Sequence, residues 1–547
     1  MTWRLFPSWS NRTAIRSFSR SQSSKTAPSD ESFFKHTSRR WVFNEEARLK
    51  ERYVRFNVAE LQRVAAKAVN RDRCTRIAKM AEGGFNKIFL LTMDDGLEVI
   101  ARIPTPIAGP PHFTTASEVA TLDFLRNTLG VPVPKIFASS STADNPVGAE
   151  YMIMERFYGE SLASRWLSLS TSDIKDVMTQ LAKMEEKMFS FRFPAYGSLY
   201  YKSDTPGPSV DLPTGRFCVG PIAKRQFWFS EREKMQLDRG PWMRAGDYLK
   251  APARREAAWI SQFAEPKPRR TFLLQTDHAI DPSEHVSLLS KYLLVAPYLV
   301  PEKEEMSSPT LRHPDLSLAN VLLVPNSSKI LGFIDWQDAA ILPLFMQAGY
   351  PAFCENDLSR PQPMTRPKLP DEFDQLSADE KAKAKKSFRL EEANLYYTAA
   401  TGLNNSSHLQ ALRLRGLGVR QYLFSQAGFP WDADFVNLKA ALVSISRGWE
   451  EFSSTPCPIS FSPEEQEKAR EESAEWNESA EILSTFRDSM GIDPEGGTEP
   501  VNFEHACNMN KKWRMELYRH SEEDEKEFCW QAWPYKDNND TTTGPTI

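Results

Sequence analysis

The sequence predicts an α+β, bilobal fold, in which a small antiparallel β lobe with one helix precedes a larger, mainly α-helical lobe with insertions. Residues 74–155 hold short apolar runs separated by turn signals, which is the pattern of an antiparallel sheet. From Ser161 onward the apolar spacing becomes helical. With 547 residues, the chain is long enough for two lobes and additional segments.

The composition argues against several classes of protein. The formal net charge of −4 is nearly balanced, so we expect no nucleic-acid partner. The six cysteines are far apart and form no Cys-x-x-Cys pair, which argues against a zinc site and a dense disulfide framework. No apolar run is long enough to cross a bilayer, so no transmembrane segment is expected.

Residues 1–35 are interpreted as a mitochondrial transit peptide and disordered leader. Residues 1–29 contain five basic residues and neither Asp nor Glu, and serine is frequent. Such a start, without a continuous apolar stretch, is typical of a presequence for the mitochondrial matrix rather than of secretion. Arg16-Ser17-Phe18-Ser19 resembles a processing site with cleavage after Phe18. The alternative is a disordered basic tail.

Residues 36–75 are predicted to form an N-terminal helical extension, because their apolar residues recur at three- and four-residue intervals. The small lobe, with its hinge, is expected over 76–160. Asp94-Asp95-Gly96 predicts a hairpin turn, and Gly130 ends the predicted helix. The expected strands are Cys74–Ala81, Phe89–Thr92, Leu97–Ile103, Val133–Ala138 and Tyr151–Glu155, and the expected helix is Thr115–Leu129.

The large lobe is expected over 161–535. Residues 200–300 combine Pro and Gly with short helical pieces, so this part is predicted to be an irregular insertion. The polar tail 536–547 is predicted to be disordered. Longer helices are predicted at 171–190, 371–398 and 463–490.

The strongest signal lies in 311–338, where three polar residues occur at a defined spacing. Asp315 follows His313 by two positions and precedes Asn320 by five, and Asp335 ends an apolar segment 15 positions after Asn320. A carboxylate at Asp315 can orient a substrate hydroxyl and accept its proton. Asn320 and Asp335 offer the oxygen ligands that Mg²⁺ prefers. Kinase-type phosphoryl transfer requires this set of groups.

The segments around these residues predict how they come together. Val321–Val324 and Ile330–Ile334 are apolar and predict a buried hairpin that presents Asn320 beside Asp335. His313 is expected to hold the loop through backbone hydrogen bonds rather than to act in catalysis. The alternative is that these polar residues only cap the turns of a hairpin.

The run from His313 to Asn320, together with Ile334 to Ala339, resembles the aminoglycoside phosphotransferase (APH) family of small-molecule kinases. The resemblance covers roughly residues 76–350. It implies a protein-kinase-like fold, with Asp315 as catalytic base and Asn320 and Asp335 as magnesium ligands. The sequence departs from the usual family pattern at Pro314, Ser317 and Ala319, where Gly, His and Gly are common.

The small lobe is expected to bind the nucleotide. Gly83, Gly84, Phe85 and Asn86 form a turn between two strands, where backbone N–H groups can approach phosphate oxygens. Such a turn by itself is often only a hairpin.

On the third strand, Arg102 is the candidate cation for the α- and β-phosphates, and Glu118 on the following helix is expected to hold it. The alternative is an exposed Arg and an exposed Glu. Protein kinases have Lys at this position. In the hinge, backbone groups from Glu155 to Phe157 are expected to face an adenine edge.

Together these features predict a phosphotransferase that uses ATP and Mg²⁺ and acts on a hydroxyl of a small molecule in mitochondria. The alternative is a catalytically weak or inactive kinase-fold binding protein with a role in mitochondrial maintenance. A protein kinase is disfavoured, because no Ala-Pro-Glu segment follows Asp335. The sequence identifies neither the acceptor nor a protein partner.

Overall fold

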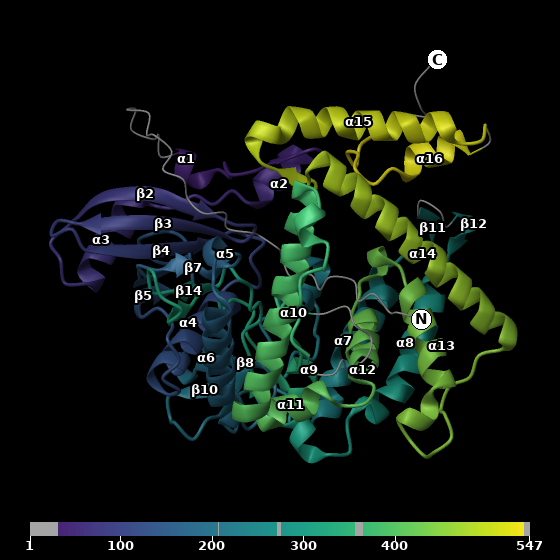
Figure 1. Ribbon diagram of the computed structural model, residues 1–547, viewed down its shortest axis with the longest axis horizontal. Coiled ribbons are helices and arrows are strands. Elements are labelled where there is room, and N and C mark those ends of the chain that lie inside the picture. Colours follow the sequence, from purple (N-terminus) through teal and green to yellow (C-terminus); the bar gives the residue numbers. More distant parts are fainter. Residues whose placement is uncertain (1–30, 206, 271–274, 356–364, 524, 541–547) are drawn as a thin grey trace.

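The computed structural model describes residues 31–205, 207–270, 275–355, 365–523 and 525–540. Figure 1 shows the β lobe at one side of the molecule, the helical lobe beside it, and the last two helices, α15 (Phe503–His520) and α16 (Lys526–Ala532), along the top of the helical lobe. The predicted transit peptide, apart from residues 31–35, lies outside the described residues, as does the tail from 541.

The small lobe is a five-stranded antiparallel sheet in the order β2-β3-β4-β6-β5. This arrangement confirms the predicted strands and the helix that interrupts them. The helix begins at Phe113, earlier than predicted, and the chain leaves it through Gly130 at a positive φ of 63°. The elements are β2 (Cys74–Glu82), β3 (Asn86–Met93), β4 (Glu98–Pro104), α4 (Phe113–Asn127), β5 (Ile136–Ser140) and β6 (Tyr151–Glu155).

The N-terminal extension is not the single helix that the apolar spacing predicted. Residues 53–57 have no regular secondary structure, and Asn57 begins a new helix by accepting a hydrogen bond from the Glu60 amide. Ordered structure also begins earlier than the predicted leader allowed, because Phe33 and Phe34 are buried against the sheet with Phe56 and Phe89. The elements are α1 (Glu31–Phe34), β1 (Arg40–Trp41), α2 (Glu45–Glu51) and α3 (Val58–Ala68).

The first half of the large lobe follows the sequence pattern only in part. The helix predicted at 171–190 is present as α6. The region 200–300 is less irregular than predicted, because two long helices, α7 and α8, pack into one apolar core with the helices that follow. The elements of this first half of the large lobe are β7 (Glu160–Ser161), α5 (Leu162–Arg165), α6 (Thr171–Ser190), β8 (Ser198–Tyr201), β9 (Val210–Asp211), β10 (Phe217–Gly220), α7 (Ala245–Phe263), β11 (Lys267–Arg270), β12 (Gln275–Ile280) and α8 (Pro282–Val295).

The second half of the large lobe contains the predicted hairpin, since β14 pairs with β15. The helix predicted at 371–398 starts later, at Ala378, because Ser377 and Glu380 form a capping box there. The elements are β13 (Pro309–Leu311), β14 (Val321–Leu323), β15 (Ile330–Phe333), β16 (Ile341–Pro343), α9 (Leu344–Gln347), α10 (Ala378–Asn404), α11 (Ser406–Leu412), α12 (Leu417–Ala427) and α13 (Val436–Arg447).

The C-terminal part returns to the N-terminal extension. Strand β17 pairs antiparallel with β1, and Trp533 and Tyr535 pack with Val42 and Phe43. The tail predicted to be disordered is ordered up to residue 540, because its polar groups bond to this extension, as in Asn538 N–H to Asn44 Oδ1 (2.8 Å). The elements are α14 (Pro463–Met490), as predicted, β17 (Gly497–Thr498), α15 (Phe503–His520) and α16 (Lys526–Ala532).

Among the helices of the described residues, none is both long enough and apolar enough to cross a bilayer.

We predict that the protein loses stability in mild acid because several histidines are buried. Burial lowers the pKa of His36, His285, His313 and His408 to about 4, whereas a histidine in the unfolded chain has a pKa of about 6.5. As the pH falls, the unfolded state therefore binds protons before the folded state does. The contribution of these neutral histidines to the free energy of unfolding is fully present above pH 6.5. It is lost as the pH falls towards 4, by about 1–3 kcal/mol per histidine.

The measurement is the free energy of unfolding in urea between pH 7.5 and 5. His285→Phe should reduce the acid loss, because its ring already lies among Trp431 and Phe435. A control change at the exposed His505 should leave it unaltered. Equal acid loss in wild type and His285→Phe would contradict the prediction.

Candidate active site

The loop after β13 is held by His313, as the sequence predicted. His313 Nδ1 accepts the amide N–H of Asp315 (3.1 Å), and Nε2 donates to the carbonyl of Ile334 (3.0 Å). This pair of contacts requires the neutral ring with its proton on Nε2. The ring also packs on Trp336, with centroids 4.4 Å apart. His313 therefore ties the loop of Asp315 to the segment of Asp335.

Asn320 lies beside both carboxylates that the sequence selected. Its Nδ2 donates to the Asp315 carbonyl (2.9 Å) and to Asp315 Oδ2 (3.3 Å), so the amide oxygen is left to accept or to ligate. Its backbone carbonyl accepts Ile334 N–H (3.0 Å), which extends the β14–β15 hairpin up to Asp335. The hairpin thus places Asn320 next to Asp335, whose loop (Ile334–Ala339) is called the metal loop below because Asp335 is a candidate magnesium ligand.

Asp335 suits a hard cation. Its side chain is 53% exposed, and its backbone adopts a left-handed φ of 65°, which turns it out of the strand. Asn320 and Asp335 supply neutral and anionic oxygen donors, a set that fits Mg²⁺ when phosphates and waters complete the coordination. These two residues would hold the metal.

Arg102 connects the small lobe to this loop. It is 5% exposed and forms a buried ion pair with Glu118, as predicted from the sequence. Its other Nη lies 3.1 Å from Asp335 Oδ1 and donates to Gln337 Oε1 (2.7 Å). Burial raises the pKa of Glu118, and the charge of Arg102 opposes that rise. A buried guanidinium needs such partners, since an unpaired buried charge is strongly destabilising.

Gln337 lies in the candidate site although it was not among the residues predicted for it. Besides Arg102, its Oε1 accepts Asn86 Nδ2 (2.7 Å), and its Nε2 donates to the carbonyl of Ala108 (2.6 Å). Asn86 of the glycine turn therefore bonds directly to the loop that carries Asp335. The only sequence signal for Gln337 was its place in the Ile334–Ala339 run.

The glycine turn lies between β2 and β3, as predicted. A Cβ built on Gly83 would meet no atom within 4 Å, so packing does not demand glycine there and the backbone stays open to a ligand. At the tip, the carbonyl of Phe85 accepts the amide N–H (2.8 Å) and the hydroxyl (3.1 Å) of Thr105. These two bonds fix the turn to the end of β4.

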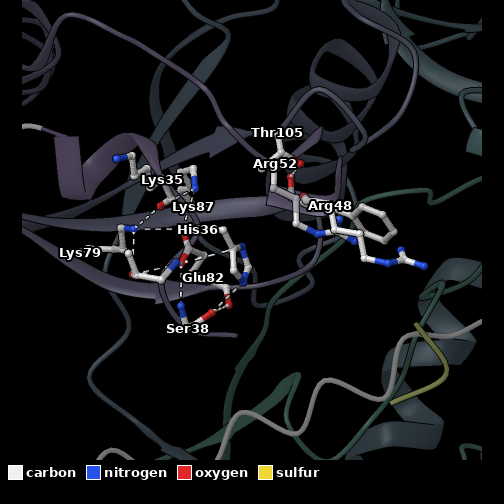
Figure 2. A network of polar contacts seen from close by, with 11 residues as sticks. Lys35, His36, Ser38, Arg48, Arg52, Lys79, Glu82, Lys87 and Thr105 are labelled. Atoms are coloured by element: carbon white, nitrogen blue, oxygen red, sulfur yellow. Dashed lines mark hydrogen bonds and ion pairs between the residues drawn. The ribbon is translucent and has the colours of Figure 1, made fainter. Parts of the chain in front are cut away.

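The base of the turn is a buried carboxylate, Glu82, shown in Figure 2. Glu82 Oε1 pairs with Lys87 Nζ (2.6 Å), and both side chains are almost completely buried. Burial alone would raise the pKa of Glu82, but His36, Lys87 and hydrogen bonds together hold it at about 2. The amides of Thr37 (2.7 Å) and Ser38 (3.2 Å) donate to Oε2. The N-terminal extension thus anchors the glycine turn.

The hinge differs in one respect from the sequence prediction. The Glu155 amide N–H donates to the Lys135 carbonyl (2.8 Å), so it is not open to an adenine edge. The Glu155 side chain pairs with Arg126 (2.8 Å). The ring of Phe157 packs against Gly332, where a Cβ would come within 2.2 Å of it. The Glu155 amide is therefore not available to an adenine edge. The expected contact is left to the backbone groups that follow it, up to Phe157.

A second buried pair supports the loop from behind. Arg312 Nε donates to Glu185 Oε1 (2.8 Å) on α6, and its Nη groups donate to the carbonyls of Gln347 (2.8 Å) and Gly349 (2.7 Å). Glu185 is fully buried and also accepts the Tyr397 hydroxyl. Arg312 therefore ties the segment that precedes Asp315, and the segment that follows the metal loop, to helix α6.

A family model described as the phosphotransferase enzyme family, APH, matches residues 77–350. This span contains the glycine turn, Arg102, Glu118 and the whole metal loop.

The chain belongs to the APH phosphotransferase family.

Curated relatives cover most of its length. A subtelomeric hrmA-associated cluster protein of Aspergillus fumigatus is 53% identical over 87% of this chain and 100% of its own. The mitochondrial protein altered inheritance of mitochondria protein 9 of Yarrowia lipolytica is 24% identical over 86% of this chain and 85% of its own. Among solved structures, aminoglycoside phosphotransferase APH(4)-Ia is 13% identical, covers 73% of this chain and 100% of its own, and superposes with a TM-score of 0.35.

Membership in the APH family agrees with the bilobal α+β fold. In this APH chain the metal-loop motif reads Ile334-Asp335-Trp336, and Trp336 is completely buried. Its ring contacts the ring of His313, which holds the loop of Asp315.

We predict that His313→Ala destabilises this APH-family protein by about 2–4 kcal/mol, because a buried ring and two hydrogen bonds are lost. The measurement is the free energy of unfolding in denaturant. The matched control is His505→Ala, at an exposed position, which should change stability by less than about 0.5 kcal/mol. Equal stability of the two variants would refute the structural role of His313.

Proposed function

We propose that the protein is an ATP- and Mg²⁺-dependent phosphotransferase that transfers the γ-phosphate to a hydroxyl of a small molecule. The observation that carries the proposal is the hydrogen-bonded group of Asp315 and Asn320 beside Asp335 at the end of a paired hairpin. Family membership supports phosphotransfer as the reaction class. A small-molecule acceptor is part of the proposal, because no Ala-Pro-Glu segment of the protein-kinase type follows Asp335.

In the proposed reaction, the acceptor oxygen attacks the γ-phosphorus of ATP. The new O–P bond forms as the bond to the β,γ-bridging oxygen breaks, so that ADP leaves and the acceptor proton passes to Asp315. Asn320 keeps Asp315 oriented through its two hydrogen bonds. A Mg²⁺ ion held by Asn320 and Asp335 would neutralise charge on the phosphate oxygens.

The environment of Asp315 suits proton acceptance. Burial raises its pKa, the charge of Asp335 raises it further, and the hydrogen bond from Asn320 opposes both. A carboxylate with a raised pKa is a better proton acceptor than an ordinary aspartate. Arg102 and the glycine turn would hold the nucleotide phosphates, with Arg102 moving between Asp335 and phosphate oxygens as ligands arrive.

We place this activity in mitochondria. The acid-free, basic start of the sequence supports import, and the relative from Yarrowia lipolytica carries a mitochondrial name.

A second candidate is a kinase-fold binding protein with little transfer activity, acting in mitochondrial maintenance. The observation that favours it is the ion pair of Arg102 with Asp335, which engages the carboxylate that a metal needs. The intact Asp315 and Asn320 favour catalysis instead, because binding alone does not require a proton acceptor.

We predict that Asp315→Asn lowers phosphate transfer by at least about 10²–10⁴-fold while Mg·ATP binding persists, because only the proton acceptor is lost. Asp335→Ala should abolish transfer through loss of the metal ligand. The measurement is transfer of labelled γ-phosphate from ATP to metabolites of a mitochondrial extract. The control is Asp371→Asn, at an exposed position. If wild type and both variants transfer equally little, the binding-protein candidate is supported instead.

We further predict that Gly83→Ala weakens Mg·ATP binding by roughly 10-fold and leaves the free energy of unfolding within about 1 kcal/mol of wild type. A methyl group at Gly83 meets no protein atom but would oppose close approach of phosphates. Calorimetric titration and denaturant unfolding provide the two measurements. Unchanged nucleotide affinity would remove the glycine turn from the nucleotide site.

A further inference from the structure

Gln337 lies two positions after the candidate metal ligand Asp335 and reaches the small lobe with both ends of its side-chain amide. Its Oε1 accepts hydrogen bonds from Asn86 Nδ2 (2.7 Å) and Arg102 Nη2 (2.7 Å), and its Nε2 donates to the carbonyl of Ala108 (2.6 Å). An amide oxygen has two lone pairs. Both acceptor positions of Gln337 are therefore occupied by donors of the small lobe.

The three partners of Gln337 belong to different parts of the small lobe. Asn86 ends the glycine turn and begins β3, Arg102 lies on β4, and Ala108 lies in the connection from β4 to α4. The carbonyl of Asn86 also accepts the amide N–H of Gly83 (3.0 Å), so that Asn86 and the glycine turn form one unit. The amide of Gln337 thus fixes the turn, the strand and the following connection to one point of the metal loop.

Arg102 connects these hydrogen bonds to the metal ligand. The same Nη2 that donates to Gln337 lies 3.1 Å from Asp335 Oδ1, and the other end of the guanidinium pairs with Glu118. On either side of Gln337, the backbones of Asp335 and Asp338 have left-handed φ angles of 65° and 64°. Such conformations persist where surrounding contacts fix them, and the hydrogen bonds of Gln337 supply contacts of this kind.

We propose that Gln337 is a positioning residue for phosphate transfer. By holding Asn86 and Arg102 at once, its amide sets the separation between the glycine turn and the metal ligand. The proposal rests on the proposed phosphotransferase function, in which the glycine turn and Arg102 contact phosphates and Asp335 holds Mg²⁺. Because the metal also binds phosphate oxygens in this reaction class, the two halves of the site have to stand at a fixed separation. Gln337 itself acts only through its partners.

Loss of the Gln337 amide should uncouple the metal from the phosphates. In the proposed site Mg²⁺ strengthens nucleotide binding, because phosphate oxygens and Asp335 ligate the same ion. Gln337→Leu keeps a side chain of similar size but removes all three hydrogen bonds. The gain in nucleotide affinity that Mg²⁺ provides should then fall on the order of 10-fold, which is within the usual range of coupling between two sites.

The experiment titrates AMP-PNP calorimetrically into the full chain, once with Mg²⁺ and once with EDTA. Because AMP-PNP binds Mg²⁺ in solution equally for every variant, the ratio of the two affinities is compared between variants. Gln337→Leu and Asn86→Ala should each lower this ratio. The double variant should lose little more than Gln337→Leu alone, because residues that act through one hydrogen bond are not additive.

The matched control is Gln421→Leu. Gln421 is half-buried in the large lobe, and its Nε2 donates to the carbonyls of Phe345 (2.8 Å) and Ala348 (2.8 Å). Loss of this amide should lower the free energy of unfolding but leave the affinity ratio as in wild type. Denaturant unfolding shows whether each variant is folded, and Asn86→Ala carries the test if Gln337→Leu is not.

The proposal is overturned if Gln337→Leu weakens AMP-PNP binding equally with and without Mg²⁺, since its role would then be structural only. It is also overturned if the effects of Asn86→Ala and Gln337→Leu are fully additive. A wild type that does not bind AMP-PNP, or gains no affinity from Mg²⁺, would instead refute the proposed Mg²⁺-dependent phosphotransferase.

Discussion

The buried charge of Arg102 is the constraint on which the rest of the candidate site depends. A guanidinium at 5% exposure must be compensated, and the compensating groups come from α4 and from the metal loop. Glu118 fixes one side of it, while Asp335 and Gln337 share the other. The same ion therefore sets the position of the helix, the third strand and the metal loop. Asp335 is therefore held in place by Arg102.

The two ends of the chain support this arrangement from outside the family region. The amides of Thr37 and Ser38 donate to the buried Glu82 at the base of the glycine turn, and Figure 2 shows Ser38 beside Glu82. The extension that carries them is itself held by β17 and by Glu495, which bonds to the buried Arg52 (2.6 Å). The C-terminal part of the chain thereby supports the glycine turn through the N-terminal extension.

The two lobes are also joined at a second place. Arg225 and Trp228 contact the small lobe at Phe85 and Phe113, and within the large lobe Arg312 ties the loop of Asp315 to α6 through Glu185.

The sequence by itself determined the two-lobed α+β fold, the five strands and the spacing of Asp315, Asn320 and Asp335, because strand periodicity and loop spacing are local properties. It also paired Arg102 with Glu118, since helix and strand positions follow from the same pattern. Only the tertiary structure decided the contacts of Gln337 and of the chain ends. Their contacts join residues far apart in sequence, and long-range pairing depends on packing that no local pattern encodes. For the same reason the long helices within 200–300 and the broken N-terminal helix were missed, because packing overrides propensity there.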